Sequence, residues 1–86
     1  MDKRLEQKIN EKITDALHNI SEIHQIAKSL DHISSNDFKY GIILGRLYNS
    51  FHYQCRRVLK RDPTQDEFAE FLEILSKRRS EILEKL

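Results

Sequence analysis

A histidine and a cysteine three positions apart, His52 and Cys55, are the residues of this chain best suited to covalent chemistry. On a helix this spacing places both side chains within reach of each other, where the imidazole could activate the thiolate as a nucleophile. However, Cys55 falls near the centre of an apolar stripe, where a cysteine behaves as a small inert hydrophobic residue. No third orienting group occurs nearby, and two residues do not make a four-ligand zinc site. We therefore predict no catalytic role for the pair.

A second polar group comprises Asp15, His18 and Glu22, which can share one face of the first predicted helix. Metal sites in helical bundles take carboxylates and histidines from several facing helices. No matching set occurs in the other predicted helices, so we interpret these residues as a solvated face. The sequence thus predicts no enzyme activity, no bound metal and no cofactor. A metal- or thiol-dependent enzyme is therefore the third and least favoured of three functional hypotheses, after the two given below.

Basic residues gather near the end of the second predicted helix and midway along the third. Such residues can complement a helix dipole or pair with glutamates one turn away. They can also contact phosphates, which makes a small nucleic-acid-binding or transcription-associated protein the alternative function. The candidate nucleic-acid contacts are Arg46, Arg56, Arg57, Lys60, Lys77 and Arg78.

The spacing of apolar residues predicts the elements that position these groups. The first predicted helix covers about residues 3–31, roughly 43 Å at 1.5 Å per residue. Its apolar residues alternate at spacings of three and four from Ile13 onward, which is the heptad pattern of a coiled coil. The members of this pattern that we expect at a helix-packing or assembly interface are Ile13, Ile20, Ile23 and Ala27.

The second predicted helix covers about 37–60 and the third about 65–85. Between them, Thr64 followed three residues later by Glu67 is a capping box, so the two helices form an antiparallel hairpin. Gly41 and Gly45 lie one turn apart, and each costs about 1 kcal/mol in helix propensity. Close approach of another helix would compensate for this cost. Phe38 and Ile42 project away from the main stripe, and we place both with the glycines at the same interface.

One local segment resembles a known family. Residues 57–72, Arg57-Val58-Leu59-Lys60-Arg61-Asp62-Pro63-Thr64-Gln65-Asp66-Glu67-Phe68-Ala69-Glu70-Phe71-Leu72, resemble the bacterial sigma-factor segment that reads roughly L-x-R-x-P-T-x-x-E-[IL]-A-x-x-L. The resemblance implies transcription-related DNA contact. A glycine turn follows this segment in sigma factors, whereas residues 73–76 continue the helix here. Most of the matched positions are also those that a capped helix start requires, so we assign the whole chain to no family.

Composition limits the remaining choices. The chain of 86 residues is 38% hydrophobic and 34% charged, with two glycines, one proline and a net charge of +1. So few turn-forming residues argue against a β-rich fold, and the balanced charge argues against a global attraction to nucleic acid or membrane. A single cysteine and the absence of an apolar leader or spanning segment favour a cytoplasmic protein.

The sequence therefore predicts one all-α domain over residues 1–86, a three-helix antiparallel bundle with a long heptad-patterned first helix. The apolar helix surface exceeds what a slim monomer covers, so we expect a homodimer or a complex with a helical partner. The leading functional hypothesis is a non-enzymatic protein–protein interaction or assembly module. It has no evident small-molecule substrate and no membrane partner.

Overall fold

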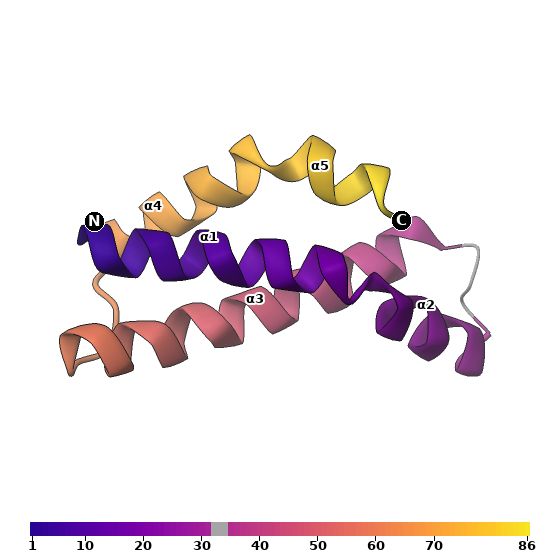
Figure 1. Cartoon of the computed structure of the whole chain (residues 1–86), viewed down its shortest axis with the longest axis horizontal. Helices are drawn as coiled ribbons and strands as arrows, with labels where there is room; N and C mark the ends of the chain where they lie inside the picture. Colours follow the sequence, from indigo (N-terminus) through magenta and orange to yellow (C-terminus); the bar gives the residue numbers. More distant parts are fainter. Residues whose placement is uncertain (32–34) are drawn as a thin grey trace.

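The computed structural model describes residues 1–31 and 35–86, and these residues form five α-helices with no strand among them. The helices are α1 (Lys3–His18), α2 (Ile20–Ser29), α3 (Asn36–Leu59), α4 (Gln65–Lys77) and α5 (Arg79–Glu84). α3 runs back along α1 and α2, and α4 and α5 then run forward again as an arch (Figure 1). The predicted all-helical class is confirmed. No helix among the described residues is both long and apolar enough to cross a membrane.

The prediction of one continuous helix over about 3–31 is wrong, because Asn19 separates α1 from α2. The backbone of Asn19 has φ −107° and ψ 27°, well outside the usual helical values. Its side-chain Nδ2 donates to the backbone carbonyl of Asp15 at 2.9 Å. Asparagine side chains compete in this way for backbone hydrogen bonds, and the competition disfavours a continuous helix.

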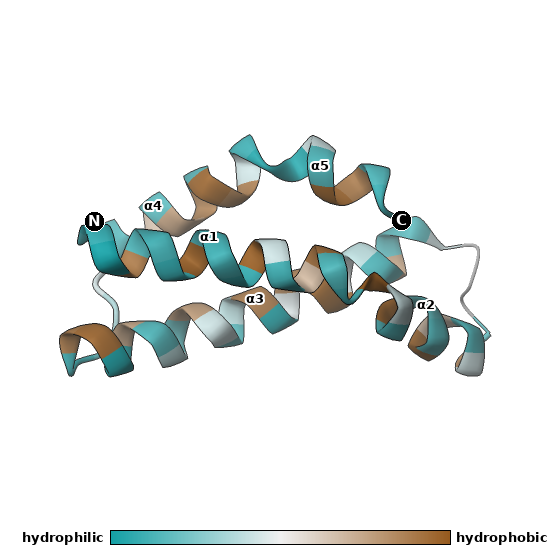
Figure 2. Cartoon of the chain, in the orientation of Figure 1, coloured by the Kyte–Doolittle hydropathy of each residue, from teal (hydrophilic) through white to brown (hydrophobic). Residues whose placement is uncertain are grey.

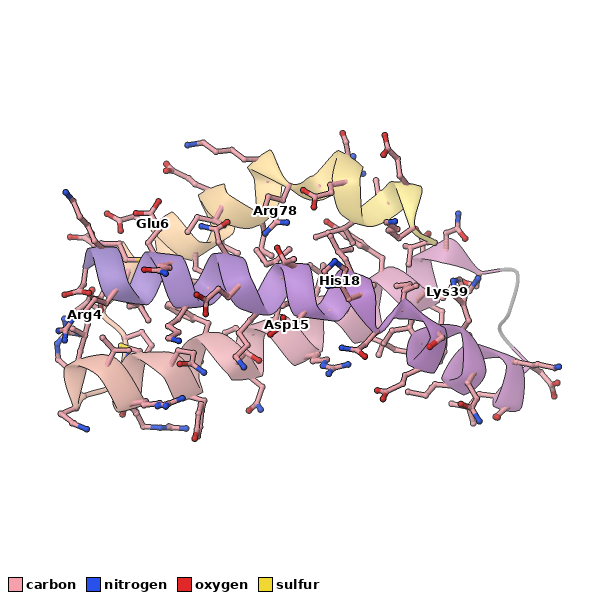
Figure 3. The ribbon with its side chains drawn as sticks, in the orientation of Figure 1. Arg4, Glu6, Asp15, His18, Lys39 and Arg78 are labelled. Atoms are coloured by element: carbon pink, nitrogen blue, oxygen red, sulfur yellow. The ribbon has the colours of Figure 1, made fainter. Side chains whose placement is uncertain are left out.

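The third predicted helix, about 65–85, also divides in two, at Arg78. This residue has φ −101° and ψ 7°, and its side chain extends from the junction of α4 and α5 to α1 (Figure 3). Nη1 donates to the backbone carbonyl of Asn10 at 2.9 Å, and Nη2 donates to Thr14 Oγ1 at 3.0 Å. Nε and Nη2 also donate to the carboxylate of Glu81. One guanidinium group at the end of α4 therefore joins α1 to α5.

The core lies where α1, α3 and α4 meet. The rings of Phe51 and Phe71 stack with centroids 4.5 Å apart and planes 3° from parallel. Hydrophobic and hydrophilic residues alternate around each helix (Figure 2), and the hydrophobic ones supply this core. Burial of these side chains is the main favourable contribution to folding. Among the described residues, the buried apolar ones are Leu5, Ile9, Ile13, Ala16, Leu17, Ile23, Ala27, Ile43, Leu47, Phe51, Cys55, Phe71, Leu75 and Ile82.

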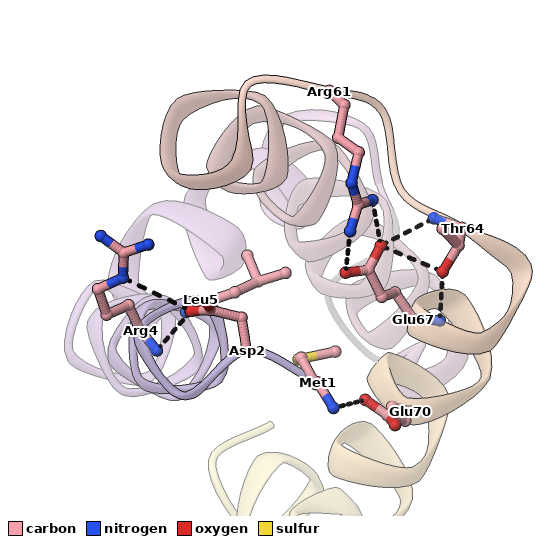
Figure 4. A network of polar contacts seen from close by, with 8 residues as sticks. All are labelled: Met1, Asp2, Arg4, Leu5, Arg61, Thr64, Glu67 and Glu70. Carbon is pink, nitrogen blue, oxygen red and sulfur yellow. Dashed lines mark hydrogen bonds and ion pairs between the residues drawn. The ribbon is translucent and has the colours of Figure 1, made fainter.

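The predicted capping box at the start of α4 is confirmed. The N–H of Glu67 donates to Thr64 Oγ1, and the N–H of Thr64 donates to Glu67 Oε1 at 2.9 Å. Glu67 is buried and also accepts two hydrogen bonds from Arg61, at 2.7 and 3.0 Å (Figure 4). Hydrogen bonds from the Arg61 guanidinium, which have the larger effect, and from the Thr64 backbone N–H lower the pKa of Glu67 from 4.5 to about 2. This carboxylate therefore joins the end of α3 to the start of α4.

We expect Arg78→Lys to lower the free energy of unfolding by about 1–2 kcal/mol, because lysine cannot reproduce the divergent donors that reach Asn10, Thr14 and Glu81. Urea denaturation followed by circular dichroism at 222 nm measures the change. The matched control is Arg79→Lys at the next residue, which is exposed. Equal stability of the two variants would show that the Arg78 contacts do not hold α1 to the arch.

We expect the stability of the folded chain to fall as the pH decreases from about 4.5 to about 2. The unfolded chain protonates Glu67 first, because the folded state holds the pKa of this carboxyl low. Glu67→Gln should cost roughly 1–2 kcal/mol at pH 7, an amount reduced by the solvent exposure of Arg61. Urea titrations at several pH values measure both effects. A pH dependence as steep in Glu67→Gln as in the parent chain would contradict the assignment.

Candidate functional site

The His52 and Cys55 side chains do not form a reactive pair. Cys55 is fully buried, and burial raises the pKa of its thiol. His52 instead packs edge-on against aromatic rings, with its centroid 4.8 Å from that of Tyr48 and 5.5 Å from that of Phe51. A protonated, inaccessible thiol is a poor nucleophile. Both side chains therefore contribute to the packing of α3.

The polar face of Asp15, His18 and Glu22 is exposed to solvent. Glu22 pairs with Arg46 of α3 at 3.6 Å. Within residues 1–31 and 35–86, no three His, Cys, Asp or Glu side chains are grouped so that they could hold a metal ion. The face therefore connects α2 to α3 through one exposed ion pair, which contributes little to stability.

The six basic residues proposed from sequence as nucleic-acid contacts do not form one surface. Arg46 pairs with Glu22, Arg56 pairs with Asp62 at 3.4 Å, and Arg78 is directed onto α1. Lys77 lines a hollow together with Glu6, Glu70 and Glu73 and with Met1, whose N-terminal ammonium group pairs with Glu70 at 2.7 Å.

Arg57 and Lys60 do lie together, beside Arg4 and Lys8 of α1. Sequence reasoning missed these two α1 residues because they are distant in the chain. The antiparallel packing of the first two predicted helices was the feature from which this meeting of basic residues could have been predicted.

The proposed interface residues also separate into two groups. Ile13, Ile23 and Ala27 are at most 2% exposed and pack inside the chain's own core. Ile20 and Ile42 are partly buried against the same core, and Phe38 is partly buried. The heptad pattern therefore faces α3 of the same chain over much of its length.

Gly41 and Gly45, by contrast, are exposed. A Cβ atom built on either would meet nothing within 4 Å. No neighbour in the folded chain therefore requires glycine at these two positions.

One side of α3 carries a regular series of residues, all exposed except the partly buried His52, that we call the glycine stripe: Asp37, Gly41, Gly45, Tyr48, His52 and Arg56. These positions are separated by four, four, three, four and four residues, which keeps them on one side of the helix. Tyr48 is 48% exposed, although one edge of its ring meets Phe68 of α4 with centroids 6.0 Å apart. The stripe thus begins with an acid, ends with a base and is uncharged between them.

Comparison of the chain with protein-family models, with curated proteins and with solved structures found no match. A functional proposal therefore rests on the surface of the chain itself. Two surface features stand out. One is the glycine stripe on α3, and the other is the group of Arg4, Lys8, Arg57 and Lys60, where α1 begins and α3 ends.

We expect the Cys55 thiol to react with Ellman's reagent roughly a hundredfold more slowly in the folded chain than in concentrated guanidinium, because reaction requires the core to open. The absorbance of the released thiolate measures the rate. A matched control is Ser50→Cys in a Cys55→Ala background, because residue 50 lies on α3 but is partly exposed. Comparable rates at positions 50 and 55 would contradict the assignment of Cys55 to the core.

Proposed function

We propose that this chain is a non-enzymatic helical interaction module that assembles with a second copy of itself through the glycine stripe. The observation that carries the proposal is the exposed pair of glycines in the interior of α3. In the proposal, α1 with α2, α3, and α4 with α5 act as the three rods of a bundle. The outer side of the middle rod is then the assembly surface.

The glycines carry a cost that the isolated chain does not offset. Glycine inside a helix is less favourable than alanine by about 1 kcal/mol. Gly41 and Gly45 lie well inside α3, and space for a methyl group is open above both. Two helices can approach each other closely where side chains are absent. A helix packed on this side of α3 would therefore supply the contacts that offset the cost.

The order of residues along the stripe favours a second copy as the partner. In a two-fold antiparallel pairing centred between Arg46 and Leu47, Gly45 faces the partner's Tyr48. Gly41 then faces the partner's His52, so each ring fills the space above a glycine. Self-complementary surfaces of this kind are what a two-fold dimer requires.

The charges at the two ends of the stripe agree with the same register. Asp37 would face the partner's Arg56 at both ends of the pairing, and opposite charges help to set register and orientation. In the single chain Arg56 pairs with Asp62 across 3.4 Å, and both side chains are more than half exposed. Such a weak pair can exchange for a new partner at little cost.

We expect the parent chain to sediment as a dimer at high micromolar concentration and Gly45→Leu as a monomer, because a leucine side chain blocks the space that the partner's Tyr48 enters. Sedimentation velocity over a dilution series measures the two species. The matched control is Ser21→Leu on the exposed side of α2. A parent chain that remains monomeric at the highest concentration would overturn the proposal.

The double variant Gly41→Ala, Gly45→Ala separates the effect of the glycines on the stability of the monomer from their effect on dimerisation. Its monomer should be more stable than the parent monomer by roughly 1–2 kcal/mol, because alanine favours the helix and its methyl groups meet nothing. Its dimer should nevertheless be weaker, because the methyl groups hold the two helices apart. Dimerisation at least as tight as that of the parent chain would contradict the proposed contact.

A further inference from the structure

A basic groove lies between the start of α1 and the end of α3. The two helices run antiparallel, so the first turns of α1 lie beside the last turns of α3 (Figure 1). The groove has a volume of about 510 Å³ and is lined by four cations, Arg4 and Lys8 from α1, Arg57 from α3, and Lys60 at the C-cap of α3. Its remaining lining residues are neutral, and no carboxylate from the part of the chain that the structure describes lies among them.

The positive charge of the basic groove is only partly neutralised within the chain. Arg4 Nε lies 3.7 Å from Asp2, whose carboxylate also accepts the N–H groups of Arg4 and Leu5 (Figure 4). Lys8 Nζ lies 3.3 Å from Glu11. Within residues 1–31 and 35–86, no carboxylate lies within 4.0 Å of the cationic groups of Arg57 or Lys60. The α3 side of the groove therefore retains two cations that are available to an anion.

Gln54 also lines the basic groove, and its environment is unusual for a polar side chain. It is 2% exposed, and its Oε1 atom is buried with no hydrogen-bond partner among the described residues. A buried polar atom without a partner is destabilising, so most such atoms in folded proteins are satisfied. The chain thus keeps a polar group at the groove where an apolar residue would suit the core better.

Lys60 occupies a backbone position that favours glycine. It ends α3 with φ 62° and ψ 29°, the left-handed conformation in which a side chain is strained. A lysine here is therefore not explained by the fold of the helix end. Its ammonium group is the fourth cation at the basic groove.

From these features we infer that the basic groove binds the phosphodiester backbone of a nucleic-acid strand. Phosphate oxygens would accept hydrogen bonds from the arginine and lysine side chains, two on each wall. The carboxamide of Gln54 lies buried beneath these cations and adds a neutral polar group to the floor of the groove. The inference is independent of assembly through the glycine stripe, because the two surfaces share no residue.

The affinity of a fluorescein-labelled single-stranded oligonucleotide, measured by anisotropy, tests the inference. If all four cations contact phosphates, a fourfold rise from 50 to 200 mM salt should weaken binding roughly 50-fold, at a slope of about 0.7 per phosphate. The double variant Arg57→Gln, Lys60→Gln should weaken binding at least tenfold. The matched control is Arg79→Gln, Lys28→Gln, which removes the same charge from exposed positions outside the groove and should bind within about twofold of the parent chain.

The variant Lys60→Gly separates binding from folding. It should raise the midpoint of urea unfolding, because glycine relieves the left-handed strain, and it should weaken the oligonucleotide complex several-fold. Three outcomes would overturn the inference: no anisotropy change at 50 mM salt, equal loss of affinity in the groove and control double variants, or binding to vesicles containing phosphatidylglycerol without binding to the oligonucleotide.

Discussion

The burial of the apolar stripe of α1 against α3 is the constraint from which the other features follow. Leu5 and Ile13 are fully buried, as is Ile43 on the opposing helix, and α1 makes its most extensive contacts with α3. Because the pairing is antiparallel, it brings the first turns of α1 beside the last turns of α3 and so creates the basic groove. It also directs the opposite side of α3 outward, where the glycine stripe is exposed.

Two polar arrangements then fix α4 and α5 onto this pair. Arg78 connects the arch of α4 and α5 to the backbone and side chains of α1, and Glu67 connects the start of α4 to Arg61. Both arrangements contain a charged side chain that is at least partly buried, and a buried donor or acceptor needs a hydrogen-bond partner. The same demand explains why these charged residues serve the fold and are not part of the proposed binding surfaces.

The three sides of α3 have different physical characters. One side is apolar and packs in the core, one contains the glycines and is uncharged between Asp37 and Arg56, and the end of a third contributes cations to the basic groove. An uncharged exposed side suits a close helix–helix contact, in which desolvated charges would be unfavourable. A cationic groove suits a hydrated polyanion, in which released counterions favour binding. One helix can therefore serve an assembly surface and a ligand surface without conflict.

The sequence by itself determined the features that depend on near neighbours. The helical class follows from apolar spacing and scarce turn residues, and the capping box at Thr64 and Glu67 forms within one turn. The placement of Cys55 in the core follows equally from its position in an apolar stripe. These features require only the 3.6-residue period of the helix and short-range hydrogen bonds.

Only the tertiary structure decided where distant residues meet. The helix break at Arg78 accompanies hydrogen bonds to residues more than sixty positions away, which the apolar pattern does not encode, whereas the break at Asn19 involves a local hydrogen bond to Asp15. The meeting of Arg4 and Lys8 with Arg57 and Lys60 depends on the register of α1 against α3. The exposure of Gly41 and Gly45 likewise depends on which side of α3 the other helices cover. Periodicity identifies the faces of a helix, but the packed chain alone determines which face remains open.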